Sequence, residues 1–115
     1  MHQIKVIIID DEWLIRAELK SMIDQYSHLD VVGEAASIAE GEALCREVKP
    51  DVIFLDIHLP GGSGFDFLDK VNGDYKIVLI TGFDQYLNKM MQYKVIDCLM
   101  KPIGKDRLEE VIKNL

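Results

Sequence analysis

Hydrophobic residues along the chain form five short runs that alternate with stretches of helical periodicity. Three of these runs are rich in Val and Ile and do not alternate with polar residues, a pattern typical of strands that are buried on both faces. We therefore predict strands at residues 4–9, 31–35, 52–55, 77–80 and 97–100.

Apolar residues spaced by three and four positions predict helices between the strands. The first helix carries one such stripe, made of Ile15, Leu19, Met22, Ile23 and Tyr26. Ser37 and Glu40 have the spacing of a capping box and predict the start of a second helix, which ends before Pro50. Ser63 and Asp66 predict the start of a third helix in a similar way.

Two further helices complete the pattern. The fourth is predicted around residues 85–93, where Met90 and Met91 blur the apolar face. The fifth is marked by an apolar stripe of Leu108, Val111, Ile112 and Leu115. Alternation of strands and helices with short links predicts right-handed crossovers and one parallel sheet covered on both faces. In such a sheet, ligands bind beyond the carboxyl ends of the strands.

Composition restricts the class of protein. A chain of 115 residues, 49% of them hydrophobic, fits a single domain with a substantial core. The net charge of −7 opposes direct contact with nucleic acid, because phosphate backbones are bound mainly by Lys and Arg. We find no apolar stretch of membrane-spanning length and no secretory signal. Cys45 and Cys98 lack metal-ligand spacing, so we expect reduced thiols in a cytoplasmic protein.

Chemically active side chains follow four of the five predicted strands. They are Asp10 and Asp11 after the first, Asp56 after the third, Thr81 after the fourth and Lys101 after the fifth. Crowded carboxylates repel one another, so either one is protonated or a cation lies among them, and Mg²⁺ is suited to such ligands. Lys101 and Thr81 are donors suited to phosphate oxygens. A carboxylate can attack phosphorus, and Asp56, on the middle strand, is the candidate nucleophile.

The segments IIIDDE, FLDIHLPGGSG, LITG and CLMKP, in this order, resemble the receiver domain of two-component response regulators over essentially the whole chain. The resemblance implies an α/β, flavodoxin-like fold with a five-stranded parallel sheet in the order 2-1-3-4-5. It implies that Asp56 accepts a phosphoryl group from a sensor histidine kinase. It also implies a Mg²⁺ site made of three carboxylates and one backbone carbonyl, those of Asp10, Asp11, Asp56 and His58. Lys101 would pair with the phosphoryl group, and Thr81 would bond to it and report it.

A finer resemblance concerns residues 81–103, TGFDQYLNKMMQYKVIDCLMKPI, which are similar to the matching stretch of LytTR-type regulators. Receivers of that type precede a DNA-binding domain. The resemblance therefore favours residues 1–115 as a receiver excised from a longer transcriptional regulator over a stand-alone receiver. It leaves open whether phosphorylation drives homodimer formation. Cys98 departs from the family, which often has an aromatic switch residue there. We expect Thr81 and residues 83–93 to carry the conformational change instead.

Other readings of the same residues stay open from sequence alone. An aspartyl phosphatase commonly carries a second aspartate two positions after its nucleophile, whereas this chain has His58 there. A phosphate-independent interaction module usually lacks an acid or the lysine, and this chain keeps both. Asp10 and Asp11 could cap the first helix, and Glu12 is interpreted as a simple first-turn acid. We expect no enzymatic turnover beyond self-phosphotransfer and autodephosphorylation.

Overall fold

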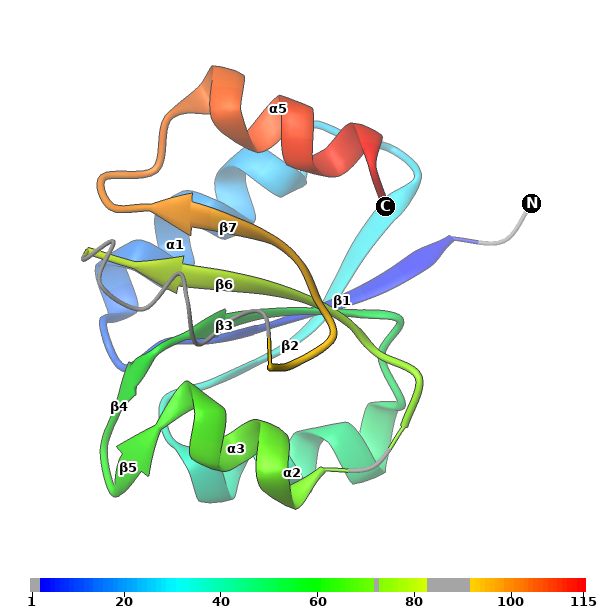
Figure 1. The fold of residues 1–115 in the computed structure, drawn as a ribbon. Helices are drawn as coiled ribbons and strands as arrows, with labels where there is room; N and C mark the ends of the chain where they lie inside the picture. Colours follow the sequence, from blue (N-terminus) through cyan, green and yellow to red (C-terminus); the bar gives the residue numbers. More distant parts are fainter. Residues whose placement is uncertain (1–2, 72, 83–91) are drawn as a thin grey trace.

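The computed structural model describes residues 3–71, 73–82 and 92–115 of the chain. Its centre is a parallel sheet in the order β2-β1-β3-β6-β7 (Figure 1). The strands of this sheet are β1 (Ile4–Ile9), β2 (Leu29–Ala35), β3 (Val52–Asp56), β6 (Lys76–Thr81) and β7 (Val95–Met100). Counted along the chain, this order is 2-1-3-4-5, which confirms the flavodoxin-like topology expected from the sequence.

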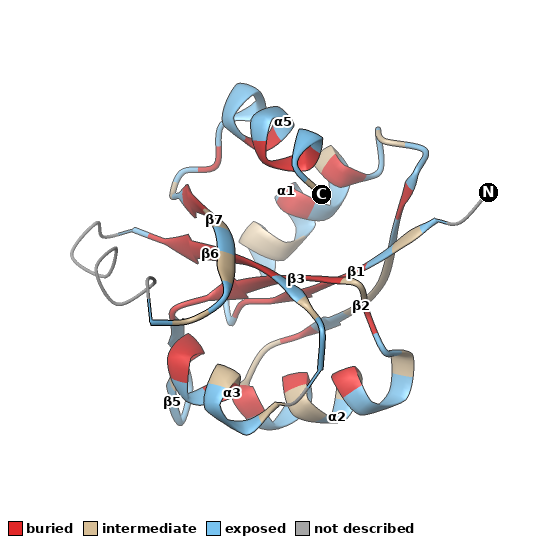
Figure 2. Cartoon of the chain, turned by 45° about the vertical axis from the view of Figure 1, so that its right-hand side comes forward, coloured by how far each residue is buried: buried red, intermediate tan, exposed pale blue. Residues whose placement is uncertain are grey.

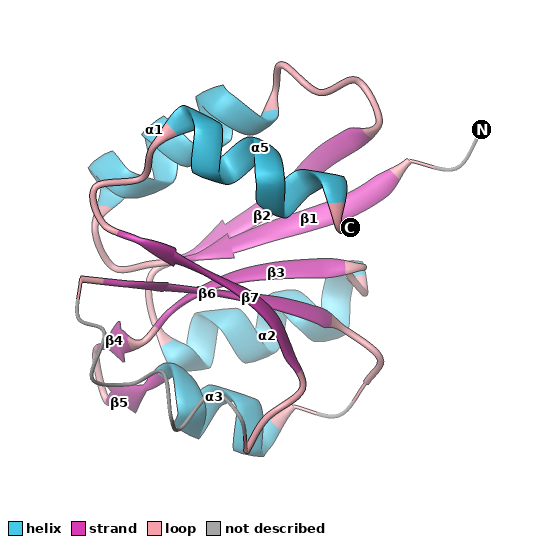
Figure 3. Cartoon of the chain, turned by 45° about the horizontal axis from the view of Figure 1, so that its top comes forward, coloured by secondary structure: helices cyan, strands magenta, loops and turns pink. Residues whose placement is uncertain are grey.

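Helices cover both faces of the sheet. One face is covered by α1 (Trp13–Ile23) and α5 (Lys105–Lys113), and the other by α2 (Ile38–Val48) and α3 (Gly64–Lys70) (Figure 3). A short antiparallel pair, β4 (His58–Leu59) and β5 (Gly62–Ser63), lies between β3 and α3 and was not predicted. No helix within the described ranges is long and apolar enough to cross a membrane.

The alternation of side chains along each strand divides the core into two layers. On β1, Val6 and Ile8 pack on the side of α1 and α5, whereas Ile7 and Ile9 pack on the side of α2 and α3. The strands of the sheet centre are buried along most of their length (Figure 2). Both faces therefore need apolar residues, which explains why the central strands read as continuous Val- and Ile-rich runs.

Strand boundaries differ from the prediction where polar residues interrupt an apolar run. β2 begins at Leu29 instead of residue 31, because the backbone of Leu29 and Asp30 already pairs with β1. β7 begins at Val95 instead of residue 97. β3 extends by one residue, so that Asp56 is itself the last residue of the strand and pairs with Ile80. Backbone pairing, and not side-chain polarity, sets these ends.

Two helix starts are capped largely as predicted. At α3, the Ser63 hydroxyl accepts from the Asp66 N–H, and the Asp66 carboxylate accepts from the Ser63 N–H at 2.8 Å. At α2, the Ser37 hydroxyl accepts from the Glu40 N–H. The Glu40 carboxylate, however, accepts from the N–H of Ala36, one residue further back than a capping box requires.

The remaining helix predictions agree in position. α1 ends at Ile23, so Tyr26 follows the helix, yet it still packs against the core beneath α1. α5 buries three of the four residues of the predicted stripe, Leu108, Val111 and Ile112. The fourth, Leu115, follows the helix and packs against the core while partly buried. The fourth helix was predicted around residues 85–93, of which residues 85–91 lie outside the described residues. Residues 92–94 form a turn before β7.

Candidate functional site

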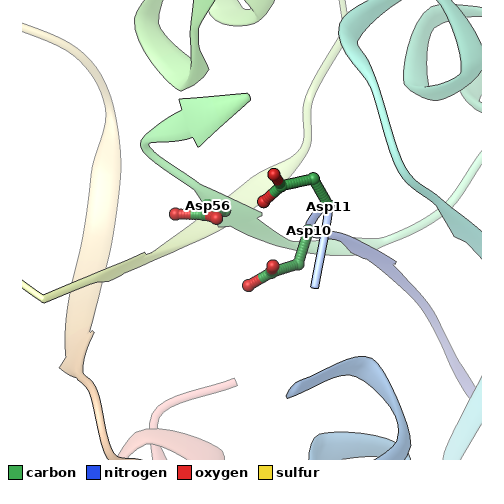
Figure 4. A group of neighbouring side chains, drawn as sticks. All are labelled: Asp10, Asp11 and Asp56. Carbon is green, nitrogen blue, oxygen red and sulfur yellow. The ribbon is translucent and has the colours of Figure 1, made fainter. Parts of the chain in front are cut away.

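Three carboxylates meet at the carboxyl ends of the two central strands (Figure 4). Ile9 of β1 pairs with Leu55 of β3, so the residues that follow on each strand are neighbours. Each of Asp10, Asp11 and Asp56 offers an oxygen within 4.8 Å of the others. Asp10 and Asp56 are buried, with 0% and 2% of their surface exposed, whereas Asp11 is exposed. The predicted acidic cluster therefore exists and opens to solvent on the side of Asp11.

Asp56 is held by two donors. The His58 N–H donates to its Oδ1 at 3.2 Å, and the Lys101 ammonium lies 3.3 Å from its Oδ2. Burial, followed by the charge of Asp10, raises the pKa of Asp56 to about 7, although both donors act to lower it. The surroundings of Asp56 therefore favour its protonated form more than those of an ordinary aspartate, and a further cation beside it would favour the carboxylate.

Asp10 has one oxygen that lacks a donor. Its Oδ1 accepts from the Glu12 N–H at 2.8 Å. Its Oδ2 is buried and, within the part of the chain that the structure describes, has no hydrogen-bond partner, although the Lys101 ammonium lies at ion-pair distance, 3.4 Å. Burial raises the pKa of Asp10, opposed by the Glu12 N–H and Lys101. A buried oxygen without a donor, beside two other carboxylates, fits a ligand of a hard cation such as Mg²⁺.

Lys101 is shared by three carboxylates. Its ammonium lies 3.4 Å from Glu12 Oε1, in addition to its contacts with Asp56 and Asp10. Burial alone lowers the pKa of Lys101, but the three carboxylates together raise it above its ordinary value, so this lysine stays charged. Glu12 is also the N-cap residue of α1, without a side-chain cap bond. The interpretation of Glu12 as a simple first-turn acid was therefore incomplete.

Thr81 and His58 lie at the same edge of the sheet. Thr81 is the buried last residue of β6, and its carbonyl accepts from the Lys101 N–H at 2.8 Å. His58 is exposed, and its backbone N–H donates to Asp56 Oδ1. Asp11 and His58 line an open depression of about 290 Å³, together with Leu59, Pro60 and Gly62. The structure therefore brings all six predicted site residues to one edge.

The sequence analysis did not assign a role to two residues that support this site. A Cβ on Gly64 would lie 2.6 Å from the backbone carbonyl oxygen of Asp56, so only glycine lets α3 begin this close to the strand end. The run of glycines after residue 60 was the available signal. Arg16 reaches the backbone of Asp10 from α1. It is one of 13 Lys and Arg residues, and nothing in its local sequence distinguishes it.

Comparisons with known proteins agree with this geometry. The family model of the response regulator receiver domain matches residues 6–113, so the chain belongs to this family. Curated relatives include the transcriptional regulatory protein BtsR of Escherichia coli, 37% identical over 97% of this chain, and the sensory transduction protein LytT of Enterococcus faecalis, 39% identical over 94% of it. The response regulatory domain of mrkE from Klebsiella pneumoniae superposes with a TM-score of 0.88 at 27% identity, covering 96% of this chain and 93% of that one.

The curated relatives show which type of regulator this receiver resembles and how much of a full regulator the chain covers. BtsR and LytT are LytTR-type regulators, which confirms the finer resemblance. The chain spans about half the length of these curated relatives, 48% of BtsR and 46% of LytT. Receiver domains are phosphoacceptors in two-component signalling, are generally signal transducers and not enzymes with turnover, and bind Mg²⁺ at an acidic pocket. The described residues include an acidic cluster of Asp10, Asp11 and Asp56 at this edge of the sheet.

Proposed function

We propose that Asp56 is the phosphoacceptor of this receiver, and that a sensor histidine kinase supplies the phosphoryl group. The observation that carries the proposal is the position of Asp56. Its carboxylate is 2% exposed at the end of the central strand, lies within 4.8 Å of two further carboxylates, and has a lysine ammonium 3.3 Å away. A strand end that presents an acid in these surroundings suits a nucleophile whose product gains negative charge.

We propose that Mg²⁺ is held by side-chain oxygens and one backbone carbonyl, those of Asp10, Asp11, Asp56 and His58. Support comes from the buried Oδ2 of Asp10, which lacks a hydrogen-bond donor among the described residues. When bound, Mg²⁺ supplies neutralising charge for the phosphoryl oxygens. The open depression beside Asp11 and His58 leaves room for the donor to approach.

The protein side of the transfer follows from the contacts of Asp56. A carboxylate oxygen attacks phosphorus as the bond between phosphorus and the donor imidazole nitrogen breaks, and the imidazole then takes a proton from water. The His58 N–H fixes the orientation of the Asp56 carboxylate during this step. The Lys101 ammonium, already 3.3 Å away, pairs with a phosphoryl oxygen of the product, and the Thr81 hydroxyl donates to another.

Two alternatives are weaker. A phosphatase with an aspartyl nucleophile commonly has a second aspartate two residues after the nucleophile as general acid, and this chain has an exposed His58 there. A phosphate-independent interaction module has no use for a lysine shared by three carboxylates. The chemistry is therefore limited to self-phosphotransfer and to loss of the phosphoryl group to water.

We further propose that residues 1–115 are the receiver of a longer cytoplasmic regulator whose output is transcription through a DNA-binding domain. The match to about half of a relative named as a transcriptional regulatory protein supports this. The net charge of −7 assigns nucleic-acid contact to another part of such a protein. Phosphorylation could control the output by driving homodimer formation. Sedimentation of the chain with and without beryllofluoride measures this directly.

Incubation with acetyl phosphate and Mg²⁺ tests the proposed function. The intact mass of the wild type should increase by one phosphoryl group, and the Asp56→Asn variant should not change. Asp51→Asn is a matched control, because Asp51 lies at the opposite end of β3 and accepts from the Lys5 N–H. A wild type that stays unmodified under these conditions would exclude a phosphoacceptor role.

A further inference from the structure

Arg16 joins three elements beneath the acidic cluster. It lies in the first turn of α1, with only 19% of its side chain exposed. Its Nη1 donates to the backbone carbonyl of Asp10 at 2.6 Å. Its Nε donates to Glu34 Oε1 on β2 at 3.2 Å. A single guanidinium group therefore connects the start of α1, the loop after β1 and the end of β2.

The bond to Asp10 controls more than one residue. The carbonyl of Asp10 and the N–H of Asp11 belong to one planar peptide group, so fixing the carbonyl fixes the plane between the two residues. The Asp10 N–H is held as well, because it donates to the Ala35 carbonyl at 3.0 Å. Asp11 itself is exposed, so the direction of its side chain depends on this peptide plane. Arg16 thereby orients both carboxylates of the pair.

Glu34 neutralises the charge of the Arg16 guanidinium group. An unpaired guanidinium group that is hydrogen-bonded to the backbone of Asp10 would repel a divalent cation at the acidic cluster. The Glu34 carboxylate pairs with it, so the hydrogen bond to Asp10 is made by an ion pair with no net charge. Arginine suits this task because its planar fork donates in two directions at once, whereas a lysine ammonium is a point charge.

From these contacts we propose that Arg16 is a positioning residue for the divalent-cation site, and that Glu34 is its neutralising partner. This inference rests on the proposed function, since it assumes that Asp10 and Asp11 bind Mg²⁺. Arg16 acts through the backbone of Asp10 and does not touch the cation. Residues that hold a metal ligand in place without touching the metal typically change metal affinity by about 10- to 100-fold when they are removed.

The test measures cation affinity directly. The electron paramagnetic resonance signal of free Mn²⁺ reports binding to the 1–115 chain, and displacement by Mg²⁺ gives its dissociation constant. Arg16→Ala should raise the Mg²⁺ dissociation constant about ten-fold at a salt concentration that screens the Glu34 carboxylate it leaves unpaired. Arg16→Lys should recover only part of the affinity. The control Arg46→Ala removes an exposed arginine, 72% exposed and paired with Glu42 on α2, and should bind as the wild type does.

Glu34→Gln supplies a second signature that loss of structure alone would not produce. It leaves the guanidinium group unpaired, so its affinity deficit should shrink as salt screens the charge, whereas the deficit of Arg16→Ala should not. If Arg16→Ala fails to fold by circular dichroism, this salt dependence and the Arg16→Lys result decide. A Glu34→Gln variant with wild-type affinity at low salt would overturn the proposal.

Asp11→Asn distinguishes a failure of the proposed cation site from a failure of the positioning role of Arg16. If Asp11→Asn loses Mg²⁺ binding while Arg16→Ala binds like Arg46→Ala, the positioning role is wrong and the proposed cation site stands. If Asp11→Asn itself binds Mg²⁺ as the wild type does, the cation site is wrong, and the role of Arg16 fails with it.

Discussion

The ammonium group of Lys101 lies 3.3 Å from Oδ2 of Asp56, although 45 residues separate the two along the chain. The contact joins the end of β7 to the end of β3 across β6. The same ammonium group also lies at ion-pair distance from Asp10 and Glu12, so one positive charge is shared by three carboxylates. A divalent cation bound at the acidic cluster would therefore share this negative charge with Lys101.

Replacing this lysine should strengthen cation binding. Lys101→Met removes a positive charge from the cluster, and at this distance a unit charge is worth more than about 1 kcal/mol. We expect the Mg²⁺ dissociation constant at pH 8 to fall on the order of ten-fold, measured by Mn²⁺ displacement. Lys105→Met, which changes an exposed lysine at the start of α5, should leave it unchanged. Weaker binding in Lys101→Met would show that the ammonium group does not oppose the cation.

Asp56 should make the metal-free protein less stable as pH rises. Its pKa is raised from 3.8 to about 7 in the folded state, so folding favours the protonated form. Its contribution to the free energy of unfolding is complete below about pH 4 and is lost as pH rises through 7. Asp56→Asn cannot titrate and resembles the protonated form. We expect it to be more stable than the wild type at pH 8, by a few kcal/mol at most, and similar at pH 4.5.

Chemical denaturation in a chelating buffer across this pH range measures the difference between the two proteins. Parallel stability curves for the wild type and Asp56→Asn would contradict a raised pKa at Asp56. Asp69→Asn serves as the control, because Asp69 is a carboxylate of α3 that contacts Tyr93 and lies away from the cluster.

Mg²⁺ should stabilise the folded chain through the acidic cluster. A cation that binds only the folded state adds about 2.7 kcal/mol at a concentration of a hundred times its dissociation constant. Millimolar Mg²⁺ should therefore raise the Tm of the wild type, and Asp11→Ala should abolish most of that rise. Asp11 is exposed, so its removal leaves the core intact. An equal rise in both proteins would identify a non-specific salt effect.

Cys98 provides no aromatic ring at the position where receivers often carry a switch residue, so we expect the conformational response to lie elsewhere in the chain. It is a buried thiol on β7 that pairs with Leu79, and burial raises its pKa. We expect Thr81 to couple the phosphoryl group to residues 83–93, because its hydroxyl lies one short link before them. Beryllofluoride should shift backbone amide signals across residues 83–93, and these shifts should shrink in Thr81→Ala. Shifts restricted to the loops at Asp10 and Asp56 would refute this route.

The sequence predicted the sheet and the acidic cluster because each active residue follows directly on an apolar run. Asp10, Asp56, Thr81 and Lys101 each end or follow a strand, and parallel pairing brings strand ends together. Two other contacts depend on the position of the start of α1 relative to the sheet, which the sequence pattern does not predict. Glu12 meets Lys101 across 89 residues, and Arg16 meets Glu34 across 18, with no periodic pattern to mark either pair.

Direct identification of the modified residue tests the central claim most sharply. The wild-type chain is phosphorylated with acetyl phosphate and Mg²⁺, reduced with borohydride, which converts an acyl phosphate of aspartate to homoserine, and digested for peptide mass mapping. We expect homoserine at position 56 and unmodified aspartate at Asp10 and Asp11. Homoserine at either of those two positions, or at none, would contradict the assignment of Asp56 as the phosphoacceptor.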